Sequence, residues 1–129
     1  MILDKNDRKI NNYDDLRVYN KLCDLHLDIS ELTFTFPNFE LYELGSQIRK
    51  SSNSIPANLA EGWNNRHIKI YLEGINRSLG ELRETLHHLF IAYRKKYLTK
   101  FKYDIYKNKY NECGRMLKSL EKSLMKYKE

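Results

Sequence analysis

Residues 68–93 read IKIYLEGINRSLGELRETLHHLFIAY, and their large apolar side chains recur at intervals of four and three residues. This spacing keeps the apolar side chains on one face of a helix, because an α-helix turns once every 3.6 residues. Three further segments, 18–36, 41–59 and 103–127, follow the same period. No segment alternates apolar and polar residues for long enough to predict a strand. The sequence therefore predicts four amphipathic helices of roughly 22, 24, 30 and 29 residues.

The predicted helix ends carry chemical signals that keep the connecting segments short. These signals are Phe36-Pro37-Asn38 after the first helix, Gly62 at the end of the second, Asn64 or Asn65 as N-cap of the third, and Thr99 as N-cap of the fourth. Helices joined by short links lie antiparallel. We therefore expect an all-α, up-down-up-down antiparallel four-helix bundle over residues 13–129, preceded by a polar arm over residues 1–12.

The size and the cysteine content exclude several classes of protein. The chain has 129 residues with few Gly or Pro, which fits a single helical domain better than a loop-rich fold. Cys23 and Cys113 lie far apart, which excludes a disulfide scaffold and a zinc finger and favours core positions for both. No apolar run approaches the roughly 20 residues of a membrane span, and the polar start does not fit a signal peptide. We expect a soluble, cytoplasmic protein without membrane contact.

Positive charge is concentrated in the second half of the chain. The formal net charge is +6, yet residues 1–64 carry 7 basic and 10 acidic side chains, whereas residues 65–129 carry 16 basic and 7 acidic ones. Long basic side chains neutralise phosphates without reading sequence, so this half predicts nucleic-acid binding. A merely solvated helix face is the alternative. The candidate phosphate contacts are Arg94, Lys95, Lys96, Lys100, Lys102, Lys107, Lys109, Arg115, Lys118, Lys122 and Lys126.

Tyrosines are interleaved with these cations. Tyrosine rings can stack on nucleic-acid bases, which would add to phosphate contact. The residues concerned are Tyr97, Tyr103, Tyr106 and Tyr110. The last three also fit the apolar spacing of the fourth helix, so core packing or subunit contact is their second interpretation.

Residues 51–58, SSNSIPAN, place Pro56 inside the second predicted helix. An interior proline removes one backbone hydrogen bond and costs ~3 kcal/mol. The small residues around it allow another helix to approach closely. Two interpretations stay open: tight packing within the bundle, or a surface shaped for a neighbouring subunit or ligand. The candidate residues of such an interface are Arg49, Lys50, Pro56, Asn58, Glu61 and Trp63.

The third predicted helix holds one pattern that is typical of metalloenzymes. Glu84 and His87 form a Glu-x-x-His pair, as in di-iron carboxylate bundles. Such sites need two of these pairs and two further glutamates, and the sequence has no second pair. Sets of residues for nucleophilic catalysis and phosphate-binding glycine loops are also missing. We therefore expect a non-enzymatic protein with no catalytic residues, no metal and no cofactor.

Several blocks of the sequence carry a resemblance to a known family. They are Leu32-Thr33 with residues 36–42, FPNFELY; residues 47–62, QIRKSSNSIPANLAEG; Ser78-Leu79 with Glu81-Leu82; and residues 114–117, GRML, with Leu120 and Ser123-Leu124. Together they resemble the bacterial four-helix-bundle family encoded in intervening sequences of large-subunit ribosomal RNA genes, from about residue 14 to residue 124. The chain departs from the family pattern in residues 63–66, where members often have another Gly, at His67, where a Ser or Thr cap is common, and at Lys96, which replaces a usual Gly.

The resemblance implies a bundle that assembles as a homopentamer. It also implies a relationship to the accessory variability determinant (Avd) proteins of diversity-generating retroelements, which bind nucleic acid and partner a reverse transcriptase. We therefore expect an Avd-like scaffold that binds RNA or RNA/DNA and a reverse transcriptase. The alternative is an intervening-sequence protein that acts as a protein-interaction scaffold without strong nucleic-acid binding.

Overall fold

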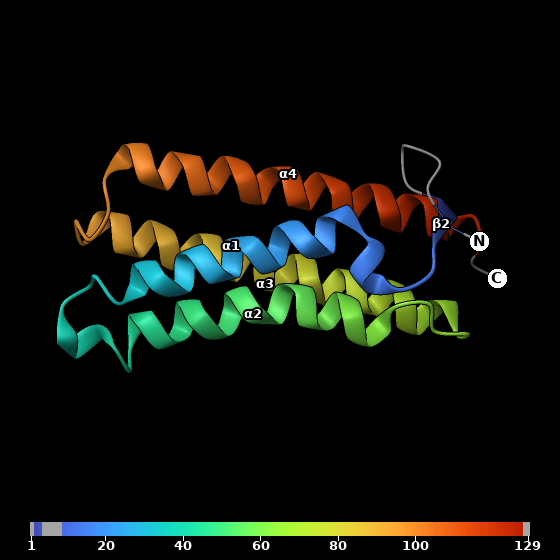
Figure 1. The fold of residues 1–129 in the computed structure, drawn as a ribbon, viewed down its shortest axis with the longest axis horizontal. Coiled ribbons are helices and arrows are strands. Elements are labelled where there is room, and N and C mark those ends of the chain that lie inside the picture. Colours follow the sequence, from blue (N-terminus) through green and yellow to red (C-terminus); the bar gives the residue numbers. More distant parts are fainter. Residues whose placement is uncertain (1, 4–8, 128–129) are drawn as a thin grey trace.

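The computed structural model describes residues 2–3 and 9–127, and the predicted four-helix architecture is confirmed for residues 17–125. Their four α-helices are α1 (Arg17–Thr33), α2 (Leu44–Gly62), α3 (Ile68–Arg94) and α4 (Lys100–Met125). Successive helices run in opposite directions (Figure 1). The link 34–43 and the turn 95–99 lie at one end of the bundle, and the loop 63–67 lies at the other. Across these described ranges, no helix combines the length and the apolar character that crossing a bilayer requires.

The core is built from the apolar faces that the spacing predicted. Side chains with at most 1% of their area exposed include Leu22, Ile29, Ile48, Ile55, Leu59, Ile75, Leu89, Tyr110, Cys113 and Leu117. Removing a large apolar side chain from water stabilises the fold by about 1.5–3 kcal/mol. Tyr127 departs from the prediction, since it is 63% exposed and lies beyond the end of α4. Cys23 is only half-buried.

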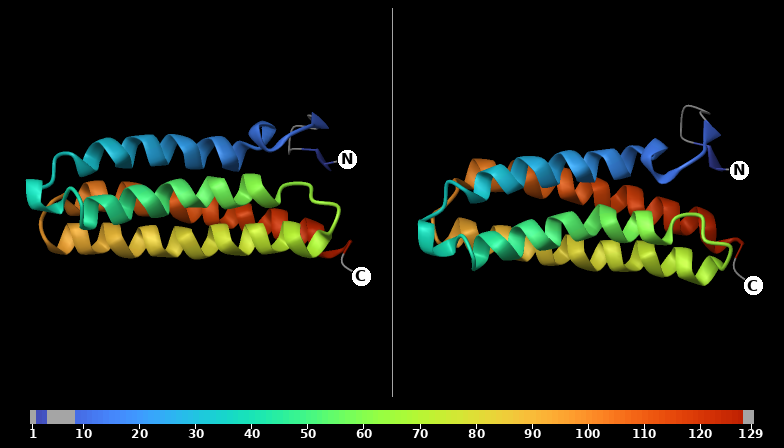
Figure 2. Two further views of the ribbon diagram at one scale, coloured as in Figure 1. Left: turned by 90° about the horizontal axis from the view of Figure 1, so that it is seen from below. Right: turned by 60° about the horizontal axis from the view of Figure 1, so that its bottom comes forward.

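Helices α2 and α3 lie side by side in both views of Figure 2, and small residues line their contact. A Cβ atom added at Gly74 would lie 2.9 Å from the carbonyl oxygen of Asn58 and 3.1 Å from the Cα of Gly62. The hydroxyl of Ser78 donates to the carbonyl oxygen of Ile55 over 2.7 Å. Helix α2 continues through Pro56, whose side chain is buried. Gly62, Gly74 and Ser78 therefore serve packing between helices of one chain.

The first helix is shorter than predicted. It ends at Thr33, and the link to α2 contains the 3₁₀-helix η2 (Asn38–Glu40). The Thr33 and Thr35 hydroxyls each donate over 2.7 Å to a backbone carbonyl three residues earlier. These bonds occupy carbonyl oxygens that would accept backbone hydrogen bonds if the helix continued. The helix therefore ends before Pro37, which would itself end it.

The start of α3 also differs from the prediction, whereas the start of α4 agrees with it. His67 is the N-cap of α3 and makes no side-chain cap bond, so capping by Asn64 or Asn65 was wrong. Asn64 instead has a φ of 49°, which asparagine tolerates better than most residues. Asn65 accepts a hydrogen bond from the His67 backbone N–H over 2.9 Å. At α4, the Thr99 hydroxyl accepts from the Lys102 backbone N–H over 3.1 Å, as predicted.

The region before α1 contains short elements that the sequence did not predict. Strand β1 (Ile2–Leu3) pairs antiparallel with β2 (Lys9–Ile10), and each has only two residues, too few for a visible alternation. A 3₁₀-helix, η1 (Tyr13–Asp15), follows and is capped by Asn12. The predicted polar arm, residues 1–12, lies partly outside the described residues. Its described end contributes Ile10 to the core, with 7% of its area exposed.

Candidate nucleic-acid interface

All eleven candidate phosphate contacts are solvent-exposed, and helix geometry sorts them by direction. Lys100, Lys107 and Lys118 fall on one line along α4, because intervals of 7 and 11 residues return close to the same angle. Arg115 and Lys122 lie beside this line, both displaced to the same side of it by roughly 40–60° around the helix axis. The line borders α3, since the Lys107 ammonium lies 5.9 Å from the ring of Tyr103, which stacks on Tyr93 of α3 with centroids 5.3 Å apart.

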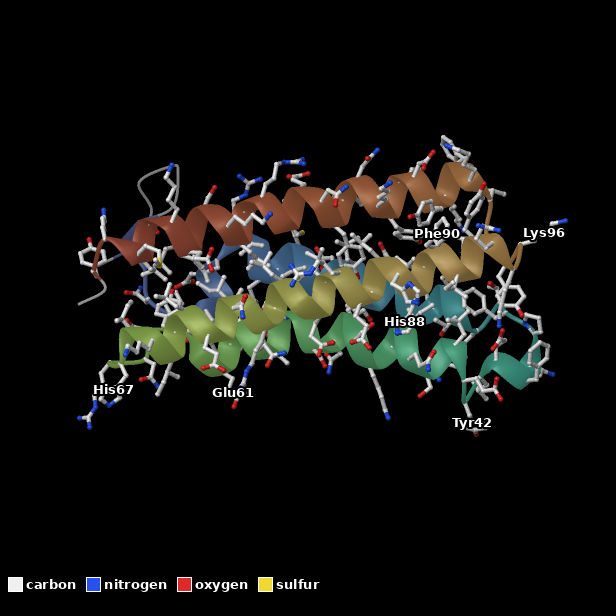
Figure 3. All side chains as sticks on the ribbon, turned by 180° about the vertical axis from the view of Figure 1, so that it is seen from behind. Tyr42, Glu61, His67, His88, Phe90 and Lys96 are labelled. Atoms are coloured by element: carbon white, nitrogen blue, oxygen red, sulfur yellow. The ribbon has the colours of Figure 1, made fainter. Side chains whose placement is uncertain are left out.

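Helix α3 presents a matching stripe beside it. Arg83, His87, Phe90 and Arg94 stand at i, i+4, i+7 and i+11, and all four are exposed. The Phe90 ring centroid lies 6.0 Å from that of Tyr103 on α4, so the stripe runs along the α3–α4 contact. Figure 3 shows Phe90 between the two helices. We call the resulting surface the α3–α4 basic face; it comprises Arg83, Arg94, Lys100, Lys107, Arg115, Lys118 and Lys122.

Two predicted contacts, Lys102 and Lys109, lie on the other side of α4. Lys102 lines a surface hollow together with Asp28 and Glu31 of α1. Lys109 lines a second hollow with Asp24 and Asp28. These lysines therefore face carboxylates of α1, and the predicted set divides between two sides of the helix.

The turn between α3 and α4 ties one further cation to a buried carboxylate. Glu40 of η2, only 1% exposed, accepts from the Lys95 ammonium over 2.8 Å and from the Tyr97 hydroxyl over 2.7 Å. The bond from Lys95, helped by that from Tyr97, holds the pKa of the Glu40 carboxyl below its usual range. The same bond raises the pKa of Lys95. Lys95 therefore joins the 34–43 link to the turn as well as carrying charge.

The remaining candidate cations lie at the two ends of the bundle. Lys96 has a φ of 67°, in the left-handed region that favours glycine, and points away from the bundle end (Figure 3). Lys126 follows α4 directly and lies 5.2 Å from the ring of Tyr127. Lys100 forms an ion pair of 2.8 Å with Asp104, which partly neutralises its contribution to the α3–α4 basic face.

The interleaved tyrosines are mostly part of the packing. Tyr110 is fully buried, and burial raises its pKa. Tyr103 and Tyr106 are half-buried against the core, and Tyr97 donates to Glu40. An exposed ring that can take a base is Phe90, which the sequence interpretation missed together with Arg83. The sequence contained a signal for both residues, because their spacing places them on one helical stripe with Arg94.

The candidate interface residues around Pro56 fall into two groups. Arg49 donates within the chain, over 2.8 Å to the Thr33 hydroxyl and over 2.6 Å to the Leu41 carbonyl oxygen. Pro56 is buried, Asn58 donates to the Ser54 carbonyl oxygen, and Trp63 packs edge-on against Tyr71. Lys50 and Glu61 are exposed, and Glu61 points away from the bundle in Figure 3.

The Glu-x-x-His pattern does not assemble a recognisable metal centre in the described residues. His88, rather than His87, lies closest to Glu84, with 3.6 Å between Nε2 and Oε1. Residues 2–3 and 9–127 contain no group of three or more His, Cys, Asp or Glu placed to hold a metal ion. Proximity of Glu84 raises the pKa of Glu81, but burial of Glu81 is the larger cause.

Comparisons with known proteins relate most of the bundle to a family. The sequence matches the family model described as 23S rRNA-intervening sequence protein over residues 14–119. Among solved structures, it is similar to a protein with unknown function from the S23 ribosomal protein family of Bacteroides thetaiotaomicron VPI-5482, with a TM-score of 0.74. The two are 26% identical, and the match covers 81% of this chain and 98% of that one. A comparison with curated proteins gave no match.

Proposed function

The chain belongs to the family of 23S rRNA-intervening sequence proteins, and on that premise we propose that it is a non-enzymatic scaffold that binds RNA or RNA/DNA. In this proposal the α3–α4 basic face contacts the phosphates of the nucleic acid. The protein acts in the bacterial cytoplasm. The observation that carries the proposal is the convergence of seven exposed cations from two helices along one surface. Such a surface neutralises phosphates and releases counterions, which gives affinity without sequence readout.

The length of this surface suits a nucleic-acid backbone. Lys100 and Lys122 are separated by six turns of α4, or roughly 33 Å at 1.5 Å per residue. One turn of B-DNA has a similar length, roughly 34–36 Å. A nucleic-acid backbone that lies along α4 therefore meets several basic side chains in succession.

The test compares two variants that lose the same charge from different surfaces. The face variant carries Lys107→Gln, Arg115→Gln, Lys118→Gln and Lys122→Gln. The control carries Lys50→Gln, Arg66→Gln, Lys102→Gln and Lys109→Gln, at four exposed positions outside the face. We expect the face variant to bind a structured RNA at least tenfold more weakly than the control, measured by fluorescence anisotropy. Equal affinities for the two variants would contradict the site.

We propose further that the chain forms a homopentameric ring, as the family resemblance implies. Support comes from large apolar side chains that are exposed in the single chain. Among them are Leu27 in α1 and Phe34 directly after it, each with 64% of its area exposed. Five copies of the 15.5 kDa chain give a mass of about 78 kDa. Light scattering should show that mass, and a monomer at micromolar concentration would contradict the ring.

The specific biological role in this proposal is that of an Avd-like subunit that holds a template RNA against a reverse transcriptase. A reverse transcriptase gene beside this one, and co-purification of the two proteins, would support that role. Placement of the gene inside a ribosomal RNA gene, without such a partner, would contradict it.

The second candidate is a protein-interaction scaffold of the intervening-sequence type. It is favoured by Phe39 and Tyr42, which are 67% and 86% exposed in the link between α1 and α2. Lys50 and Glu61 would extend such an interface along α2. This candidate predicts negligible RNA affinity at physiological salt, which separates it from the first.

A further inference from the structure

We infer that the ring of Phe90 is a stacking platform for an unpaired base, so that the α3–α4 basic face prefers single-stranded nucleic acid to duplex. The inference deepens the proposed function and rests on it, since the surrounding cations must first bind the backbone. It concerns a group of side chains from two helices, Phe90 and Tyr93 of α3 and Tyr103 of α4, which we call the aromatic cluster.

Within the aromatic cluster, Tyr93 and Tyr103 support the ring of Phe90. The rings of Tyr93 and Tyr103 stack with centroids 5.3 Å apart and an angle of 16° between planes. Phe90 packs against both, at 6.3 Å and 6.0 Å. Both tyrosines are half-buried, whereas Phe90 keeps 38% of its area in solvent. A ring that is exposed but supported needs little reordering before a base stacks on it.

Cations surround this ring. The Arg94 guanidinium lies 5.7 Å from the centroid of Phe90, and the Lys107 ammonium lies 5.9 Å from that of Tyr103. A nucleotide whose base covers Phe90 therefore has basic groups within reach of its phosphates. The Arg94 guanidinium, which lies over the Phe90 ring in this structure, would move outward to cover the second side of that base.

The positive charge around Phe90 favours a nucleic-acid strand over an apolar protein segment as the binding partner. An apolar segment of a protein would have to remove Arg94 and Lys107 from water without an opposite charge. A nucleic-acid strand supplies both an aromatic surface and the compensating phosphates. In a duplex the bases are stacked inside, so only an unpaired nucleotide can reach Phe90.

The test uses leucine, which keeps an apolar side chain at position 90 but removes the ring. We expect Phe90→Leu to weaken binding of a 20-nucleotide single-stranded RNA by about tenfold, within the usual range for loss of one stacked base. Binding of a 20-base-pair RNA duplex should stay within twofold of the unaltered protein. The matched control is Phe101→Leu on α4, where the ring is 76% exposed and lies outside the aromatic cluster; it should leave both affinities unchanged.

Three outcomes would overturn the inference. Unchanged single-strand affinity of Phe90→Leu would exclude stacking. An equal loss on the duplex would show that Phe90 only supports the packing of α3 on α4. A changed assembly mass, with affinity falling in parallel, would make Phe90 a subunit contact. If the unaltered protein binds neither RNA, the proposed function fails and the inference fails with it; if it binds both equally and Phe90→Leu has no effect, only the inference fails.

Discussion

Glu40 shows how one buried charge joins two connections that lie 55 residues apart in the chain. Its carboxylate accepts bonds from Lys95 and Tyr97 of the α3–α4 turn, and its other oxygen lies 3.5 Å from the Leu44 backbone N–H. A buried charge without partners would be very costly, so these donors make its burial possible. Glu40 therefore fixes the end of the bundle from which the α3–α4 basic face begins.

We expect Glu40→Gln to lower the free energy of unfolding by about 2 kcal/mol at neutral pH, because a hydrogen-bonded charge pair is lost. The folded-state pKa of Glu40 is lowered by its bond to Lys95. Its stabilisation is therefore complete above the ordinary pKa of glutamate and disappears as the pH falls through the lowered value. Urea unfolding from pH 7 to pH 3 should show the two proteins converging below about pH 4.3. The exposed neighbour change Glu43→Gln should have little effect; a constant difference at all pH values would contradict this role of Glu40.

Lys96 carries a local backbone cost, because its φ of 67° lies in the left-handed region. Side chains with a Cβ atom lose roughly 1–2 kcal/mol there relative to the right-handed region. Lys96→Gly should therefore raise the free energy of unfolding, by about 0.5–1 kcal/mol after the greater flexibility of unfolded glycine is counted. Asn64→Gly, at a φ of 49°, should gain less, since asparagine tolerates this conformation. A less stable Lys96→Gly protein in thermal unfolding would show that its side chain contributes more than its backbone costs.

At the scale of the helices, the α2–α3 pair depends on two glycines that meet across the contact. Added Cβ atoms at Gly62 and Gly74 would meet backbone atoms of the facing helix at 3.0 Å and 2.9 Å. Backbone atoms cannot move aside as the end of a flexible side chain can. The close approach also lets Ser78 and Thr85 of α3 bond to α2, over 2.7 Å to a carbonyl oxygen and 2.8 Å to the Ser51 hydroxyl.

Two glycine-to-alanine changes on α3 should therefore act in opposite directions. Gly74→Ala should lower the free energy of unfolding by about 1–3 kcal/mol, because α2 and α3 must separate. Gly80→Ala meets its nearest neighbouring side-chain atom only at 4.0 Å, so it should raise stability by about 0.5–1 kcal/mol through helix propensity alone. Urea denaturation of both variants measures the difference. A stable Gly74→Ala protein would show that the helices separate at little cost.

The helices could be predicted from sequence because one apolar period governs each of them along its length. Their ends could not be predicted equally well, since they depend on local bonds. The hydroxyls of Thr33 and Thr35 end α1 early, and Asn65 bonds outside α3 instead of capping it. The charge pattern predicted which helices carry the cations, but the division between Lys107 and Lys109 required the positions of α1 and α3. Phe90 shares a helical stripe with Arg83 and Arg94, which the sequence could have shown, but its support by Tyr93 and Tyr103 required the positions of α3 and α4.

At the scale of the whole molecule, charge is distributed unevenly around the bundle. The α3–α4 basic face collects cations, whereas α1 and the preceding η1 carry a set of exposed carboxylates, namely Asp14, Asp15, Asp24, Asp28 and Glu31. The net charge of +6 thus understates the local potential over the basic face. Such an asymmetric field orients an approaching polyanion and raises its rate of association.

The most direct measurement of the central claim is the salt dependence of RNA binding by the unaltered protein. Fluorescence anisotropy with a structured RNA, from 50 to 200 mM salt, gives the slope of log K against log salt concentration. Each phosphate contact adds about −0.9 to this slope for B-DNA and about −0.7 for a single strand. We expect a slope of roughly −3 or steeper, since several cations of the basic face should each bind one phosphate. Negligible binding at 50 mM salt, or a slope near zero, would contradict phosphate contact and leave the positive charge as a solvated surface.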